Sequence, residues 1–521
     1  MGDFGVFAVA DRDPDRLALV DPQERTVTYG ELTAHMHEFA RGLQARGLGP
    51  GDTLAVVLPN CREFVELYGA AVESGLTFVA LNWHLGAEEL AYVLDDAGAR
   101  AVVTTARFAE ATITAADQAG IEARTRFSID DAPGMRPLGE LGDGQPDSPL
   151  ESPRLGRIMF YTSGTTGKPK GVHKHVAGVD DRDIALIAGI GLRPTAFAAL
   201  ASVPADRRVD FACGPMYHAA PLASVCGALD NGALLVMLDR WTPEDFLHRV
   251  ERYHVTNVSM VPTMFHRLLA LPEEQRRAAD VSSLEVVSHA GAPCPIDVKR
   301  RMIEWWGPII LEAYSSTEGA GTSVTSEEWL RKPGTVGKPS AGVTVTIVDA
   351  EGNECPPGVP GLVFVSQTLW QFEYHNDLAK TEAGRRGDLF TVGDIGYLDE
   401  DGYLFLCDRQ ADVIVSGGVN VYPAEVEATL LTHAAVADAA VVGVPSDEWG
   451  EEVRAVVEVT VGVDAGAALG DELVAYCRDR LAHYKCPRAV DFVGSLGRDP
   501  NGKLRKQTIR DRYWEGRDRK I

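Results

Sequence analysis

The first quarter of the chain alternates between amphipathic segments and short apolar runs. In Thr28–Gly51, apolar residues recur at helical spacing, at Leu32, Met36, Phe39, Ala40 and Leu43. The segments that follow predict strand Thr53–Leu58, helix Arg62–Ser74, strand Phe78–Leu81, helix Ala87–Ala97 and strand Ala101–Thr104. Because strands alternate with helices, we expect a parallel sheet with crossover helices.

The alternating pattern returns in the middle of the chain and then changes. Strands are predicted over Ala233–Leu238, Asn257–Val261 and Leu284–His289, with a helix over Pro243–His254. After about residue 340, Gly342–Asp349 and Gly361–Ser366 alternate apolar and polar residues between turns rich in Gly and Pro. This texture is typical of antiparallel sheet, and we expect a barrel-like piece here.

A domain boundary is predicted near Asp408–Asp412. Beyond it, the pattern indicates helix Pro423–His433, strands Val436–Val444 and Glu452–Val461, and helix Ala468–Leu481. About a hundred residues is an ordinary domain size. The predicted fold is therefore α/β, with a large domain of stacked α/β subdomains over 1–408 and a small α+β domain over 413–521.

Composition narrows the class of protein. The 521 residues carry a net charge of −25, which disfavours a sequence-independent nucleic-acid binder. From Arg478 to the end, 13 Lys and Arg face 6 Asp and Glu. This basic tail suits an anionic ligand, although a solvated tail explains it equally well.

The cysteines and the apolar stretches indicate a reduced, cytoplasmic protein. The eight cysteines are scattered and none forms a CxxC pair, so no zinc or redox motif is signalled. The N-terminus shows no signal peptide. Ile184–Val203 is apolar, but Arg193-Pro194 interrupts it, which favours a buried or lid helix pair over a membrane span.

The most informative stretch is Thr162–Gly171, with the sequence TSGTTGKPKG. A loop this dense in glycines and hydroxyls forms an anion nest, and its lysines favour phosphate. It is not a Walker A loop, since only two residues separate Gly164 from Gly167 and Pro169 follows Lys168. A P-loop kinase or GTPase is therefore disfavoured.

This stretch resembles the phosphate loop of the adenylate-forming enzymes, a superfamily of acyl- and aryl-CoA synthetases, adenylation domains and firefly luciferase. Further motifs follow in the expected order from about Pro14 to Lys506. The resemblance implies ATP, Mg²⁺ and coenzyme A as cofactors, and a small C-terminal domain that moves. It assigns ATP binding to Thr162, Ser163, Gly164, Thr165, Thr166, Gly167 and Lys168.

Two more blocks resemble the family's nucleotide site. Small residues after a predicted strand let a flat ligand approach the backbone, and the resemblance places adenine on Gly291 and Ala292. In the block Ala313–Gly319, the expected roles are base stacking for Tyr314, the α-phosphate for Thr317 and the metal for Glu318. Ser316 is expected to line the nucleotide site, and Ser315 stands where the family often has glycine.

The ribose site and the hinge are expected near the boundary. The resemblance assigns the ribose hydroxyls to Asp394, assisted by Arg409, and a carboxylate is the usual acceptor for a ribose diol. Asp401-Gly402 predicts a hairpin turn between them. Residues 409–412 resemble the hinge, whose pivot is usually Asp or Lys but is Ala411 here.

The C-terminal domain is expected to supply the remaining groups. The resemblance places the pantetheine arm of coenzyme A against Gly417 and Gly418. Pro423 then starts a helix whose acids, Glu425 and Glu427, we interpret as helix stabilisers. One of only 11 lysines, Lys503, is implied to be the catalytic lysine of adenylation.

The acid and the acceptor are less well defined. His218, Ala219 and Ala220 resemble the start of the acyl pocket, with His218 among the expected catalytic residues. This block contains no carboxylate that could pair with a substrate ammonium group, which argues against an amino-acid substrate. The small residues suit a fatty or bulky cyclic acid. Coenzyme A is the expected acceptor, and an amine or a separate carrier protein are alternative acceptors. A protein that binds nucleotide without catalysis is an alternative function. We expect no nucleic acid and no integral membrane association, and a homodimer stays open.

Overall fold

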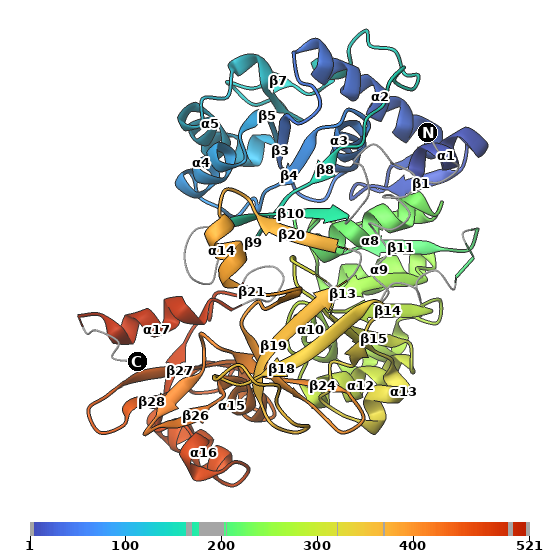
Figure 1. The fold of residues 1–521 in the computed structure, drawn as a ribbon. Coiled ribbons are helices and arrows are strands. Elements are labelled where there is room, and N and C mark those ends of the chain that lie inside the picture. The colour runs from blue at the N-terminus through green and yellow to red at the C-terminus, as the bar shows by residue number, and fades with distance from the viewer. Residues whose placement is uncertain are drawn as a thin grey trace.

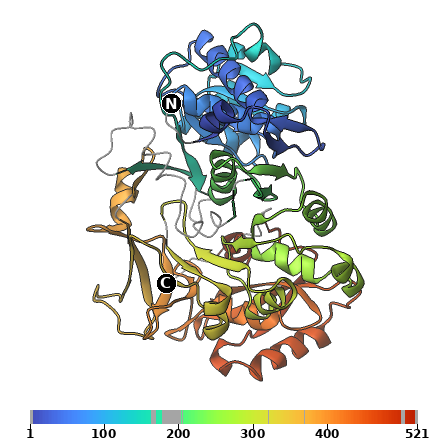
Figure 2. The same ribbon diagram turned by 90° about the vertical axis from the view of Figure 1, so that its right-hand side faces the viewer.

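The computed structural model describes residues 5–162, 169–176, 203–204, 206–319, 321–367, 370–498 and 504–516. The blue N-terminal part and the orange-red C-terminal part occupy opposite ends of the molecule (Figures 1 and 2). The predicted helix pair over Ile184–Val203 lies outside the described residues apart from Val203. None of the described helices is long and apolar enough to span a membrane.

The first sheet is built by the alternating pattern of the N-terminal quarter. Its described strands are all parallel, in the order β7 (Arg136–Pro137), β6 (Arg126–Ser128), β5 (Ala99–Thr104), β3 (Thr53–Val57), β4 (Thr77–Ala80) and β8 (Arg157–Ile158). The helices of this part are α2 (Tyr29–Ala45), α3 (Arg62–Glu73), α4 (Ala87–Asp96), α5 (Ala109–Gln118) and α6 (Gly139–Gly142). The predicted parallel sheet with crossover helices is thereby confirmed.

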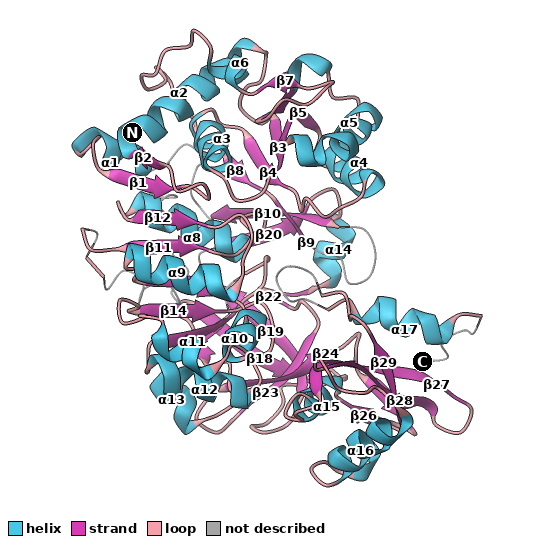
Figure 3. Cartoon of the chain, turned by 180° about the vertical axis from the view of Figure 1, so that it is seen from behind, coloured by secondary structure: helices cyan, strands magenta, loops and turns pink. Residues whose placement is uncertain are grey.

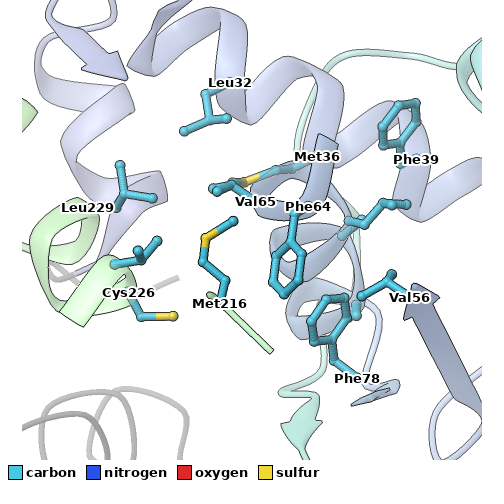
Figure 4. Packing of buried hydrophobic residues seen from close by; sticks show 14 of the residues in the cluster. Leu32, Met36, Phe39, Val56, Phe64, Val65, Phe78, Met216, Cys226 and Leu229 are labelled. Carbon is cyan, nitrogen blue, oxygen red and sulfur yellow. The ribbon is translucent and has the colours of Figure 1, made fainter. Parts of the chain in front are cut away.

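Local chemistry explains where α2 begins and what it covers. The Thr28 side chain accepts from the Glu31 backbone, while the Glu31 carboxylate accepts from the Thr28 backbone, which forms a capping box. The apolar face of α2 then packs into a core in which Phe64 meets Phe78 edge to face, with ring centroids 5.5 Å apart. Figure 4 shows Met36 of α2 next to Val65 and Phe64, with Leu32 further from these rings.

The second sheet carries the middle of the chain. Within the described residues it has nine strands, in the order β17 (Lys338–Pro339), β16 (Thr322–Val324), β15 (Ile310–Tyr314), β14 (Val286–His289), β13 (Asn257–Met260), β11 (Val209–Ala212), β12 (Leu234–Met237), β1 (Leu17–Val20) and β2 (Thr26–Thr28). The strands from β15 to β1 are parallel. Figure 3 shows β1, β12, β11 and β14 stacked in this sheet.

Helices flank this second sheet, and the first strand of the chain is embedded in it. The helices are α1 (Val6–Arg12), α8 (Ala219–Asp230), α9 (Pro243–Tyr253), α10 (Pro262–Leu269), α11 (Glu273–Ala278), α12 (Ile296–Trp306) and α13 (Ser326–Arg331). Because β1 pairs with β12 and not with the first sheet, the start of the chain ties the two subdomains together.

Two antiparallel sheets follow. One has β20 (Trp370–Tyr374), β10 (Lys170–Val176) and β9 (Phe160–Thr162). The other has β18 (Val343–Val348), β19 (Gly361–Gln367), β21 (Arg385–Arg386), β22 (Leu389–Phe390), β23 (Asp394–Leu398) and β24 (Leu404–Arg409), with α14 (Leu378–Ala383) beside β20. The antiparallel texture predicted after residue 340 is confirmed, and the expected hairpin turn at Asp401-Gly402 joins β23 to β24.

The C-terminal unit is a small α+β structure. Its sheet contains β25 (Ile414–Ser416), β26 (Val419–Val421), β27 (Val436–Ser446), β28 (Gly450–Val459) and β29 (Ala489–Val493). Its helices are α15 (Pro423–Leu430), α16 (Ala467–Arg478) and α17 (Lys506–Trp514). Pro423 occupies the first turn of α15, as the sequence predicts.

Two interpretations need correction. The short apolar run Ile158–Tyr161, before the phosphate-loop sequence, is typical of a single strand. In the structure it divides at Met159, whose backbone N–H donates to the carbonyl of Phe78, so β8 joins the first sheet and β9 another. Glu425 and Glu427 do more than stabilise their helix. Glu425 accepts from Lys485 at 2.7 Å and Glu427 from Lys506 at 2.9 Å, so both fix distant parts of the C-terminal unit.

Candidate active site

The candidate residues follow the carboxyl ends of neighbouring parallel strands. The segment with His218 comes after β11, Gly291 after β14, and Thr317 after β15. In open α/β sheets, ligands bind at this edge, because the loops that leave it converge there. The topology therefore brings together three blocks that are well separated along the chain.

The loop after β15 presents Glu318 at this edge. The backbone N–H of Ser316 donates to the carbonyl of Gly319 at 3.0 Å, and the Gly319 N–H returns to the Ser316 hydroxyl at 3.2 Å. This closed turn leaves Thr317 half-buried and Glu318 7% exposed. The Ser316–Gly319 sequence is also typical of a helix N-cap, but this loop starts no helix, and the next described element is β16.

The carboxylate of Glu318 is held by a residue that sequence reasoning missed. The Tyr374 hydroxyl, at the end of β20, donates to Glu318 Oε1 at 2.8 Å. Burial, followed by the negative charge of Glu318, raises the pKa of Tyr374 well above its usual value, so its hydroxyl keeps its proton. The 56 residues between the two explain why no local pattern indicates the pair.

Asp394 lies in a second cluster with two other expected residues. The Tyr314 hydroxyl donates to Asp394 Oδ2 at 2.6 Å, and Arg409 Nε lies 3.4 Å from Asp394 Oδ1. Asp394 and Arg409 are also paired across β23 and β24. Burial and the Asp394 charge raise the pKa of Tyr314, which stays a donor. The structure thus brings together Tyr314, to which the resemblance assigns base stacking, and the two residues to which it assigns the ribose, Asp394 and Arg409.

A small pocket lies beside this cluster. Its lining includes Tyr314, Ser316 and Gly319 on one side and Val363 and Phe390 on the other. Gly291 has a φ of 86°, a conformation that favours glycine, and Ala292 follows it in the turn after β14.

The phosphate-loop sequence connects β9 to β10. Thr162, the last residue of β9, is the partner of Lys170 across the hairpin. Lys170 Nζ lies 3.3 Å from the carboxylate of Asp377, the residue before α14. Ser163, Gly164, Thr165, Thr166, Gly167 and Lys168 lie outside the described residues.

The candidate acyl pocket begins at the N-terminus of α8. His218 is the N-cap residue, and Ala219 and Ala220 form the first turn, all three half-buried. Beside them the Tyr217 ring packs edge to face on Trp83, with centroids 6.4 Å apart. Trp83 in turn stacks on Phe108. A group of aromatic rings thus adjoins this segment through Tyr217, and sequence reasoning did not single out Trp83.

The C-terminal unit holds the hinge and the coenzyme A candidates. Gly417 and Gly418 both have positive φ, at 59° and 81°, in the turn between β25 and β26. A Cβ on Gly417 would lie 2.6 Å from the Trp449 ring, so glycine is required there. Ala411 keeps a polar contact through its backbone, since Arg510 donates to its carbonyl at 3.0 Å. Lys503 lies outside the described residues.

Comparison with known proteins shows that most of the chain matches one enzyme family. Residues 6–371 match the family described as AMP-binding enzyme, and residues 425–503 match the AMP-binding enzyme C-terminal domain. A feruloyl-CoA synthase of Amycolatopsis sp is 34% identical over 514 residues, which cover 96% of this chain and 98% of that protein.

Two solved structures are similar over their whole length. The o-succinylbenzoate CoA synthetase of Bacillus subtilis, in complex with its acyl-adenylate intermediate, aligns with a TM-score of 0.81 at 29% identity and covers 97% of each chain. An amide bond synthetase of Marinactinospora thermotolerans aligns with a TM-score of 0.80 at 26% identity and covers 98% of this chain and 100% of that one.

Proposed function

This chain belongs to the AMP-binding enzyme family, and we propose that the cluster of Tyr314, Glu318 and Asp394 is where it activates a carboxylic acid. The protein is an AMP-forming acid–thiol ligase, which uses ATP to make an acyl-adenylate and then transfers the acyl group to coenzyme A. One observation carries the assignment of the site. Tyr314 and Asp394, 80 residues apart, meet at 2.6 Å at the carboxyl edge of the sheet.

The first half-reaction must overcome repulsion between two anions. A carboxylate oxygen attacks the α-phosphorus of ATP, the bond to the bridging oxygen breaks, and pyrophosphate leaves with that electron pair. In our assignment Asp394 accepts from the ribose hydroxyls, which fixes the nucleotide. Thr317 donates to the α-phosphate. Lys503 stabilises the charge that develops between carboxylate and phosphate.

Glu318 fits a magnesium ion. Its buried carboxylate is a hard oxygen ligand, and the hydroxyl of Tyr374 fixes one of its oxygens at the edge of the candidate site. When bound, Mg²⁺ neutralises phosphate charge. In our assignment Tyr374 and the closed Ser316–Gly319 turn hold this carboxylate in place before the nucleotide arrives.

For the second half-reaction we infer that the C-terminal domain, residues 413–521, turns about 409–412. The thiol of coenzyme A attacks the acyl carbonyl and AMP leaves with its phosphate oxygen. Turning would withdraw Lys503 and bring Gly417 and Gly418 to the acyl-adenylate, where their bare backbone admits the pantetheine arm. Motion of this kind separates two half-reactions in one site.

We propose an aromatic or fatty acid as the substrate. The small side chains of Ala219 and Ala220 and the aromatic rings that adjoin this segment through Tyr217 support a bulky apolar group. The relative named feruloyl-CoA synthase supports an aromatic acid. All eight cysteines are free thiols, which supports work in a reducing compartment such as the cytoplasm.

A mass-spectrometric assay tests the proposal. The protein is incubated with ATP, Mg²⁺, coenzyme A and a panel of aromatic, fatty and cyclic acids. Lys503→Ala is run beside Lys380→Ala, which removes the same charge from the exposed surface of α14. We expect acyl-CoA and AMP from the wild type and the control, and neither from Lys503→Ala. When acyl-AMP is supplied instead, Lys503→Ala should still form the thioester.

Two results would overturn parts of this scheme. If AMP and pyrophosphate form without a thioester, coenzyme A is excluded as the acceptor. Amines are then the next acceptors to test, since one of the structural relatives is an amide bond synthetase. A Lys503→Ala variant that makes acyl-AMP at the wild-type rate would exclude the role given to Lys503.

A further inference from the structure

Lys174, on β10, has no role in the scheme above. Side chains alternate along a strand, and residues paired across an antiparallel ladder share a face. Val172 is paired with Tyr374, and Lys174 with Phe372. Lys174 therefore projects from the face that carries Tyr374, whose hydroxyl holds Glu318.

The Lys174 amine has two neighbours that act on its charge in opposite directions, the surrounding protein and Glu318. Its side chain is exposed to solvent, yet the protein around it desolvates the charged amine and lowers its pKa. The negative charge of Glu318 acts in the opposite direction. Within the part of the chain that the structure describes, the amine forms no salt bridge. A partly desolvated cation is suited to an incoming anion.

The position of Lys174 along β10 connects it with the nucleotide. β10 begins at Lys170, directly after the phosphate-loop sequence, and Lys174 lies four residues further along the same strand. Four residues of strand span about 13 Å, so Lys174 and Lys170 are positioned to contact different parts of the bound reactants. The negative charge of the candidate metal ligand, Glu318, acts on the Lys174 amine, and the Tyr374 hydroxyl that holds Glu318 comes from the same face of this sheet.

We propose that Lys174 is a further binding residue of the first half-reaction, contacting a phosphate or carboxylate oxygen of the bound reactants beside Glu318. The shared chemistry is an anionic oxygen that accepts from an ammonium group. Its two sources are the β- and γ-phosphates of ATP and the carboxylate of the acid. The proposal rests on the proposed function, since both anions are reactants of adenylation.

Calorimetry with the intact protein separates these sources. Binding of MgATP and of AMP is measured for the wild type, Lys174→Met, Lys174→Arg and the surface control Lys380→Met, and the KM of the acid is taken from pyrophosphate release. AMP lacks the β- and γ-phosphates, so it reports the remainder of the nucleotide site. Because the Lys174 side chain is exposed, Met is expected to fold, and Lys174→Gln provides a second neutral variant.

If Lys174 contacts the β- or γ-phosphate, Lys174→Met weakens MgATP about 10- to 100-fold and leaves AMP within about twofold. If it contacts the carboxylate, both nucleotides keep their affinity and the KM of the acid rises by a similar factor. In either case Lys174→Arg recovers most of the loss. The proposal is overturned if Lys174→Met and Lys174→Gln match Lys380→Met in all three measurements. A missing thioester product would refute coenzyme A as acceptor without touching these affinities.

Discussion

Replacing Tyr374 by Phe removes one hydroxyl and keeps the ring. That hydroxyl donates to Glu318 at 2.8 Å, while the ring packs edge to face on Phe372 with centroids 5.5 Å apart. The substitution therefore tests the hydrogen bond with the packing left in place. If Glu318 holds a metal during adenylation, an unanchored carboxylate should bind that metal less well and position it less accurately.

The expected magnitude follows from the nature of the bond. A hydrogen bond to a charged group contributes about 1.5–3 kcal/mol, and each 1.4 kcal/mol is roughly tenfold in rate. With the bond fully formed in the transition state, Tyr374→Phe should lower the adenylation rate about 10- to 100-fold. The Mg²⁺ concentration that gives half the maximal rate should rise as well, whereas the KM of the acid should stay within about twofold.

Pyrophosphate release, measured across a range of Mg²⁺ concentrations, provides the assay. Tyr403→Phe is the matched control, because the Tyr403 hydroxyl contacts a glutamate too, Glu328 at 3.4 Å, but away from the candidate site. A thermal melt of each variant checks that both fold. The reasoning is refuted if Tyr374→Phe equals Tyr403→Phe in rate and in Mg²⁺ dependence, since the bond to Glu318 would then have no part in adenylation.

Three further outcomes are expected. Asp394→Asn keeps the shape of the side chain but loses its charge, so calorimetry should show AMP and ATP binding about tenfold more weakly; unchanged AMP affinity would contradict a ribose contact. Burial raises the pKa of Asp230 from 3.8 to about 6, so ionisation in the folded state is unfavourable and stability falls as pH rises between these values. Asp230→Asn should remove that slope and be about 3 kcal/mol more stable than the wild type near pH 7, with little difference near pH 3; parallel urea-denaturation curves over pH would argue against this account. Lys506→Met leaves the Glu427 carboxylate, which Lys506 contacts at 2.9 Å, without its cation and should lower the free energy of unfolding by about 3 kcal/mol. Adding Glu427→Gln should recover part of this loss, and a double variant no better than the single one would exclude the pair as the cause.

Much of the fold could be predicted because its signals are local. The capping residue Thr28 and the spacing from Leu32 to Leu43 identify α2 to within a few residues of its bounds. Pro423 likewise marks the start of α15. Near the sheet edge, the resemblance identified Tyr314, Asp394 and Arg409, which the structure brings into contact.

What could not be predicted depends on pairings between distant segments. Nothing near Tyr374 indicates that its hydroxyl reaches Glu318, because the contact joins β20 to the loop after β15, which belongs to another sheet. Glu427 has the position of an ordinary first-turn acid, and only the packing of α17 supplies Lys506 as its partner. The split at Met159 has the same origin, since the choice of neighbouring strand is a tertiary event.

The embedding of β1 in the second sheet has a consequence for synthesis. Residues Ala18, Leu19 and Val20 are at most 1% exposed in the finished fold, yet Leu19 pairs with Leu235, which emerges from the ribosome long afterwards. At roughly 5–20 residues per second, the first strand waits about 10–40 s for this neighbour. During that interval β2 is the neighbour with which it pairs, and a two-stranded hairpin is marginally stable in water. The nascent chain therefore carries an apolar strand with one unpaired edge for about two fifths of its translation, and products that stop before β12 retain that edge permanently.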